Sequence, residues 1–85
     1  MDIDVELKIL ATIEQSLGAK KVLNHWEEDQ LQEMIEVLMR HFRDQQKTAD
    51  WFFKVNPFLD DTAPITLIRD GNINKVRSFV KSFFK

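Results

Sequence analysis

The stretch that decides the fold is residues 51–76, which read WFFKVNPFLDDTAPITLIRDGNINKV. Asn56-Pro57 ends a preceding helix, because the residue before a proline is pushed out of the helical region of backbone space. Pro64 suits the first turn of a short helix, where its missing N–H would have no helical partner. Gly71 can adopt the left-handed backbone that ends this helix and reverses the chain. The stretch therefore predicts a helix, a loop, a short helix, a turn and a final helix.

Two segments upstream also carry apolar residues at helical spacing. The first predicted helix covers residues 4–17, and Gly18 follows it where a helix-ending glycine belongs. Asn24 and Glu27 have the three-residue spacing of a capping box, which predicts the start of a second helix. The apolar stripes of these two helices are Val5, Ile9, Ile13 and Leu17 in the first, and Leu31, Ile35, Leu38 and Phe42 in the second.

No residue breaks helix between Trp26 and Val55, although this span is too long for one average helix. The polar patch Arg43–Thr48 therefore predicts a bend, or a new helix capped by Thr48. Trp51 lies on the same helical face as Val55, and we expect it to anchor the core of this half. We expect Thr62 to cap the short helix, and Asn72 or Asn74 to start the last one. The whole pattern predicts an all-α fold, a small bundle of four to five helices.

The length of 85 residues predicts a single helical domain at 1–85, with a helical pair at 1–45 followed by the punctuated part at 48–85. The chain has no cysteine, and its two histidines, His25 and His41, have no metal-ligand partners at useful spacing. It also lacks a phosphate-binding glycine loop and a serine-nucleophile motif. We therefore expect neither an enzyme nor a bound cofactor or metal. No apolar run approaches the ~20 residues of a membrane span, so we expect a cytoplasmic protein that does not contact membranes.

Charge is distributed unevenly along the chain. Residues 1–36 carry nine acidic and three basic side chains, whereas residues 69–85 carry five basic side chains and one acidic. A basic end can approach an acidic protein face or nucleic acid. Residues 1–45 contain no tight turn between two short helices, so no helix-turn-helix is evident and nucleic-acid binding is not the expected function.

The punctuating residues keep a fixed spacing. Trp51 is followed after four residues by Asn56-Pro57, one residue later by Leu59, and after four more by Pro64; Leu67, Gly71 and Val76 complete the series. From Trp51 to Val76, this spacing resembles without a gap the C-terminal toxin-binding domain of the Xre/MbcA/ParS antitoxins. The resemblance covers about residues 48–85. Asp60-Asp61 stands where that family usually has Gly-Gly, so this turn is expected to differ in backbone or charge.

The resemblance implies a module that binds and occludes a partner protein, such as a RES-type NAD-degrading toxin. The last helix and its tail are the expected partner-binding surface, namely Arg77, Lys81, Phe83, Phe84 and Lys85. Phe83 and Phe84 cannot both face the same small core, and an aromatic side chain left outside is a candidate hot spot for binding.

Three alternatives remain open from the residues themselves. The chain can be a stand-alone phage or mobile-element inhibitor or adaptor that blocks a host protein complex. It can bind nucleic acid through its basic tail, which would make binding strongly salt-dependent. It can also form a homodimer, since the two apolar stripes of residues 1–45 offer more apolar surface than a monomer of this size is expected to bury.

Overall fold

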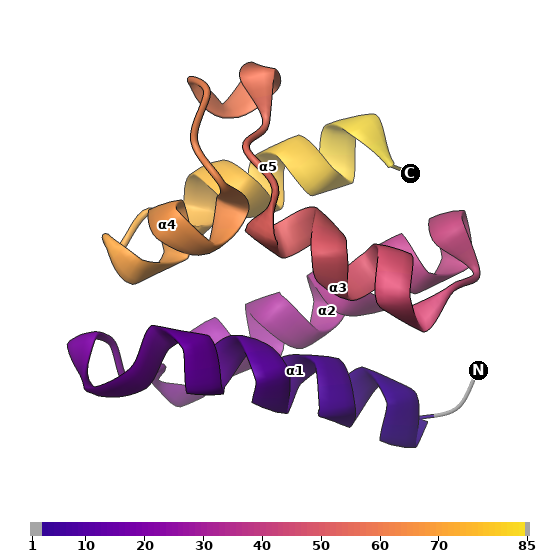
Figure 1. Cartoon of the computed structure of the whole chain (residues 1–85), viewed down its shortest axis with the longest axis horizontal. Helices are drawn as coiled ribbons and strands as arrows, with labels where there is room; N and C mark the ends of the chain where they lie inside the picture. Colours follow the sequence, from indigo (N-terminus) through magenta and orange to yellow (C-terminus); the bar gives the residue numbers. More distant parts are fainter. Residues whose placement is uncertain (1–2, 85) are drawn as a thin grey trace.

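The computed structural model describes residues 3–84, and these residues form five α-helices. The helices are α1 (Ile3–Leu17), α2 (His25–Phe42), α3 (Gln45–Phe53), α4 (Pro64–Arg69) and α5 (Ile73–Phe83), with 3-10 turns at Gly18–Lys20 and Pro57–Leu59. In Figure 1, α1 lies along one side of the molecule and α4 and α5 lie along the other, with α2 and α3 between them. The predicted all-α bundle of four to five helices is confirmed.

The core lies where α1, α2 and α3 meet and extends under α4 and α5. The two upstream apolar stripes supply much of it, since Ile9, Ile13, Leu31, Ile35 and Leu38 are each no more than 1% exposed. Burying a side chain of this size stabilises the fold by about 1.5–3 kcal/mol. Because both stripes are largely buried within one chain, they leave no broad apolar face for a second copy. The homodimer stays a prediction, without this surface to support it.

The start of α2 matches the predicted capping box. The Glu27 backbone N–H donates to Asn24 Oδ1 at 2.8 Å, and the Asn24 N–H donates to Glu27 Oε1 at 3.2 Å. Lys21 Nζ also lies 2.9 Å from Glu27 Oε2. Glu27 is only 6% exposed, and the Asn24 N–H and Lys21 Nζ together satisfy a carboxylate that burial would otherwise disfavour.

The predicted break between the second and third helices is present, but the predicted cap was wrong. Arg43 takes a left-handed backbone with φ of 54° and ends α2, and Asp44 then caps α3 by accepting the Lys47 N–H at 2.8 Å. Thr48 instead lies inside the first turn, fully buried, with its hydroxyl donating to the Asp44 carbonyl at 2.8 Å. A carboxylate suits this position because it both accepts the unpaired N–H and meets the positive end of the helix dipole.

Asn56-Pro57 follows the end of α3 as predicted. The Asn56 N–H donates to the Thr62 carbonyl at 3.2 Å, which closes the loop of residues 56–62. Thr62 does not cap α4, contrary to prediction: Ala63 holds that position, and the Thr62 hydroxyl donates to the Asp60 carbonyl at 3.1 Å. Pro64 at the first turn of α4 makes a side-chain cap less necessary, because its nitrogen needs no acceptor.

Gly71 has the predicted positive φ, at 85°. Its N–H donates to the Ile68 carbonyl at 3.1 Å, and the next N–H, of Asn72, donates to the Leu67 carbonyl at 2.8 Å. These bonds satisfy the last carbonyls of α4 and turn the chain into α5, which Asn72 precedes as predicted. The motif residues with apolar side chains between these turns are buried: Leu59, Pro64, Leu67 and Val76.

Candidate partner-binding groove

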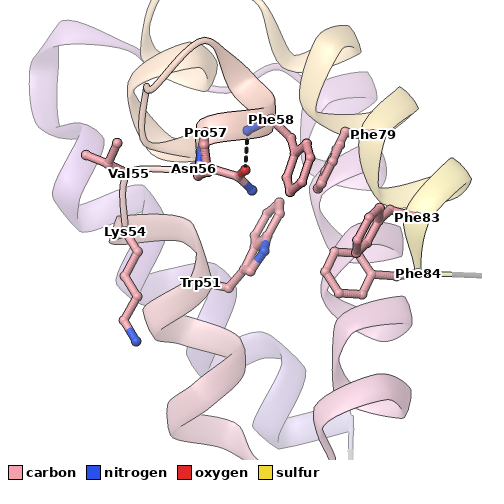
Figure 2. A pocket seen from close by; sticks show the side chains of 9 residues that line it. All are labelled: Trp51, Lys54, Val55, Asn56, Pro57, Phe58, Phe79, Phe83 and Phe84. Atoms are coloured by element: carbon pink, nitrogen blue, oxygen red, sulfur yellow. Dashed lines mark hydrogen bonds between the residues drawn. The ribbon is translucent and has the colours of Figure 1, made fainter.

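Aromatic side chains from three segments form one open groove. The aromatic groove has a volume of about 300 Å³ and is shown in Figure 2, with Trp51 rising from α3, Phe58 descending from the 56–62 loop, and the other rings coming from the end of α5. Its lining residues are Trp51, Lys54, Val55, Asn56, Pro57, Phe58, Phe79, Phe83 and Phe84. This volume is at the lower end of the ~300–1,000 Å³ of ligand pockets, and fits one or two side chains of a partner.

Phe79 is the centre of the ring cluster. Its ring is stacked with Phe83 at a centroid distance of 5.1 Å, and with both Trp51 and Phe58 at 6.2 Å. The ring of Phe84 contacts the ring of Trp51 edge-on, at a centroid distance of 5.8 Å. Such aromatic pairs contribute about 0.5–1.5 kcal/mol each beyond the area that they bury. The rings that line the groove therefore stabilise one another's positions.

The local sequence explains why Phe58 lines the groove. Asn56 Oδ1 accepts the Phe58 N–H at 2.9 Å, which fixes the turn that follows Pro57. Lys75 on α5 pairs with Asp60, so the loop is also tied to the helix opposite. Asp60 and Asp61 have φ values of 57° and 54°, the left-handed region in which glycine is the favoured residue. The loop is thus a defined structure that presents an aromatic ring.

Two phenylalanines of the groove are largely exposed, Phe58 at 70% and Phe83 at 61%. Val55, which also lines the groove, is 65% exposed. A full aromatic side chain offers about 150–250 Å² of contact area, so this cluster leaves a contiguous apolar surface in water. Apolar surface gathered around a hollow in this way is typical of an interaction site.

The expectation for Trp51 needs correction. Phe52, with 0% exposure, is the residue of this pair that lies in the protein core. Trp51 is only partly buried: it packs against the core and also lines the groove. Val55, expected to be buried beside it, lies after the end of α3 and is exposed.

The predicted partner-binding residues do not form one surface in the structure. Phe83 is exposed and Phe84 is 8% exposed, so the two consecutive rings do face different surroundings. Phe84 is not available as an exposed contact, because it packs against His41 at 4.8 Å and Phe42 at 5.9 Å. Arg77 is partly buried, and Lys81 pairs with Glu33 on α2 at 2.8 Å. Neither basic residue lines the aromatic groove, and Lys85 lies outside the described residues.

Sequence reasoning missed Phe58, Trp51 and Lys54 as candidate binding residues. Phe58 carried a usable signal, since an aromatic residue between Pro57 and Asp60 lies in a loop with no helical face to bury it. Lys54 carried none, because a lysine near the end of a helix is common. Its place in the groove depends on how the chain returns from α3 to α5.

Three carboxylates of α1 and α2 have shifted pKa values. Burial, and then the neighbouring Glu36, raise the pKa of Glu6, which is 5% exposed; burial and Glu28 raise the pKa of Glu14. Burial also acts to raise the pKa of Glu27, but the hydrogen bonds from Lys21 and Asn24 outweigh it and lower the pKa overall. The acidic excess of residues 1–36 therefore concentrates negative charge at the contact between α1 and α2.

Within residues 3–84, no three His, Asp or Glu side chains gather where they could hold a metal ion. His25 and His41 are both exposed. Over the same residues no helix combines the length and the apolar character that crossing a bilayer requires. In the described part of the chain, the aromatic groove gathers exposed aromatic side chains around a hollow, and this lining is suited to contact rather than to proton transfer.

Comparisons with protein-family models, with characterised proteins and with solved structures find no match for this chain.

Proposed function

We propose that this chain is a protein-binding module that neutralises its partner by covering it, as an antitoxin does, and that it performs no catalysis. The observation that carries the proposal is the aromatic groove with Phe58 and Phe83 exposed on its rim. Aromatic side chains in a hollow dominate binding energies at protein interfaces, where truncating one can cost 2 kcal/mol or more. Leaving them in water without a partner would be unfavourable for an isolated domain.

The resemblance of residues 48–85 to antitoxin toxin-binding domains supports the same proposal. The main departure, Asp60-Asp61 in place of Gly-Gly, occurs in a turn where both residues have positive φ. Glycine adopts this backbone most readily, so the aspartates change the charge of the turn while keeping a backbone that Gly-Gly would accept. In this proposal a RES-type toxin is the expected partner, and the groove with Phe83 contacts it.

The experiment is affinity capture from the native host, followed by mass spectrometry. The wild type is compared with Phe58→Ala and Phe83→Ala, and with Val22→Ala as a control for an exposed apolar residue, 81% exposed, away from the groove. We expect one protein to be captured by the wild type and the control, and to be lost or strongly depleted with both groove variants. Equal capture by all four proteins would contradict the proposal.

The identity of the captured protein then distinguishes the two functions considered. A RES-type toxin that regains activity when the groove variants replace the wild type supports the antitoxin. A host complex blocked by the wild type supports instead the stand-alone phage or mobile-element inhibitor.

A further inference from the structure

The surface beside the aromatic groove is basic. Trp51 and Lys54 line both the groove and an adjoining hollow that also contains Lys47 and Asp50. Phe84 lines the groove and, on its other side, a hollow with Arg43. The groove therefore adjoins two shallow hollows that present cationic side chains: one shares Trp51 and Lys54 with it, and the other lies across Phe84 from it. We call Arg43, Lys47 and Lys54 the basic rim.

The three cations of the basic rim are exposed, and none forms an ion pair with a carboxylate of residues 3–84. Other cations behave differently: Lys75 pairs with Asp60, and Lys81 pairs with Glu33. The rim is also a local concentration of positive charge in a chain whose net charge is −2.

The two carboxylates nearest the rim are already engaged in bonds within α3. Asp44 Oδ1 accepts the Lys47 backbone N–H at 2.8 Å as the helix cap, and Asp50 Oδ1 accepts from Gln46 Nε2 at 2.8 Å. Each of these carboxylates reduces the positive potential of the rim, but neither forms an ion pair with a side chain of the rim. The basic rim therefore has positive charge to offer to a partner.

From this arrangement, and resting on the proposed function, we infer that the groove takes a peptide segment of the partner that has an apolar anchor side chain and flanking carboxylates. The anchor enters the aromatic groove, and the carboxylates lie over Arg43, Lys47 and Lys54. Complementary potentials of this kind select the partner and speed its approach, while the buried anchor supplies most of the affinity.

Single-stranded nucleic acid, which also combines phosphates with flat bases, fits the groove less well. Bases bind by stacking on open aromatic faces. Here the ring of Phe79 is stacked with Phe83 and with Trp51, so these faces are turned towards one another. The acidic contact between α1 and α2 would also repel a long polyanion.

The test is a selection of random twelve-residue peptides displayed on phage against the folded full-length chain. Parallel selections use Phe83→Ala, the rim reversal Lys47→Glu/Lys54→Glu, and Lys8→Glu/Lys20→Glu as a matched control on exposed lysines outside the groove. We expect the wild type and the control to enrich peptides with an aromatic or large aliphatic residue and a net negative charge. The rim reversal should enrich neutral or basic peptides, and Phe83→Ala should enrich few.

Binding of the most enriched peptide is then measured by fluorescence anisotropy. We expect the rim reversal to weaken it about tenfold, which corresponds to about 1.4 kcal/mol, because two exposed and solvent-screened attractions become repulsions. Raising the salt concentration from 50 to 300 mM should weaken binding to the wild type and not to the rim reversal.

The outcomes separate this inference from the proposed function. Peptides that depend on Phe83 and carry no excess of acidic residues would overturn the inference and leave the groove as a protein-binding site. Enrichment that is independent of Phe83 would contradict both. Tighter binding of a labelled oligothymidine than of any selected peptide would also overturn the inference, in favour of nucleic acid.

Discussion

Phe52 and Phe53 are consecutive phenylalanines of α3 with opposite surroundings, which makes them a sharp test of the fold. Phe52 has 0% exposure and Phe53 has 40%. Removing the Phe52 ring leaves a cavity inside a thin core, so Phe52→Ala should lower the free energy of unfolding by about 3–5 kcal/mol. A domain of this length has only about 4–13 kcal/mol in total.

The matched control is Phe53→Ala. It removes a partly exposed ring and opens no closed cavity, so it should lower the free energy of unfolding by only about 1–2 kcal/mol. In a domain of this size each kcal/mol corresponds to roughly 4–8 °C in Tm, so Phe52→Ala should melt at least ~12 °C below the wild type. Thermal melting followed by circular dichroism measures both variants. Equal losses for the two, or a larger loss for Phe53→Ala, would refute the assignment of Phe52 to the core.

Three further predictions concern backbone strain and pH, each read from melting or urea unfolding. Gly71→Ala should destabilise by about 1 kcal/mol through its positive φ alone, because a Cβ there meets no atom within 4 Å; an unchanged Tm would argue against the left-handed turn. Asp61→Gly should have the opposite sign and stabilise by about 0.5–1 kcal/mol, since φ is 54°; destabilisation would mean that the aspartate makes a needed contact. Because the folded pKa of Glu6 is raised above its usual 4.5, its protonation favours the folded state, and stability should rise as the pH falls from 7 towards that value. Below pH 4.5 stability should fall as Glu27, whose pKa is lowered, loses its charge. Glu14, whose pKa is also raised, adds to the rise above pH 4.5, so the rise should shrink in Glu6→Gln; an undiminished rise would exclude Glu6 as a source.

The features that the sequence predicts well are those set by neighbours within a few residues. The Asn24 and Glu27 capping box depends on a spacing of three residues, and Asn56-Pro57 stops a helix through the geometry of one peptide bond. Gly71 at positive φ follows from its lack of a Cβ. Each of these was predicted because no distant contact is needed to decide it.

Consecutive aromatic residues show where prediction from sequence ends. Trp51 and Phe52, like Phe83 and Phe84, point about 100° apart on a helix, and either member of a pair can face the core. Distant neighbours make the choice: Phe84 turns inward because His41 and Phe42 of α2 receive its ring. The pattern predicts that Trp51 anchors the core of this half, whereas the structure buries Phe52 fully and Trp51 only in part.

The aromatic groove could not be predicted because it joins two neighbouring segments, the end of α3 and the 56–62 loop, to α5, which follows later along the chain. Trp51, Phe58 and Phe79 meet only after α5 has folded back beside α3 and the 56–62 loop (Figure 2). The sequence indicated one of its exposed residues, Phe83, through the argument that two terminal phenylalanines cannot share a small core. The basic rim lies within residues 43–54, and it was not predicted because its role depends on the groove beside it.

In the proposed function, the aromatic groove is the surface that contacts a partner protein. Site-specific photo-crosslinking detects such a contact at a chosen residue. A benzophenone amino acid replaces Phe83 in one protein and Val22 in another, both positions being exposed but only the first lining the groove. After irradiation in lysate of the native host, we expect a single protein crosslinked through position 83, competed away by unlabelled wild type, and none through position 22. A crosslink to a competed partner through position 22, with none through position 83, would contradict the account.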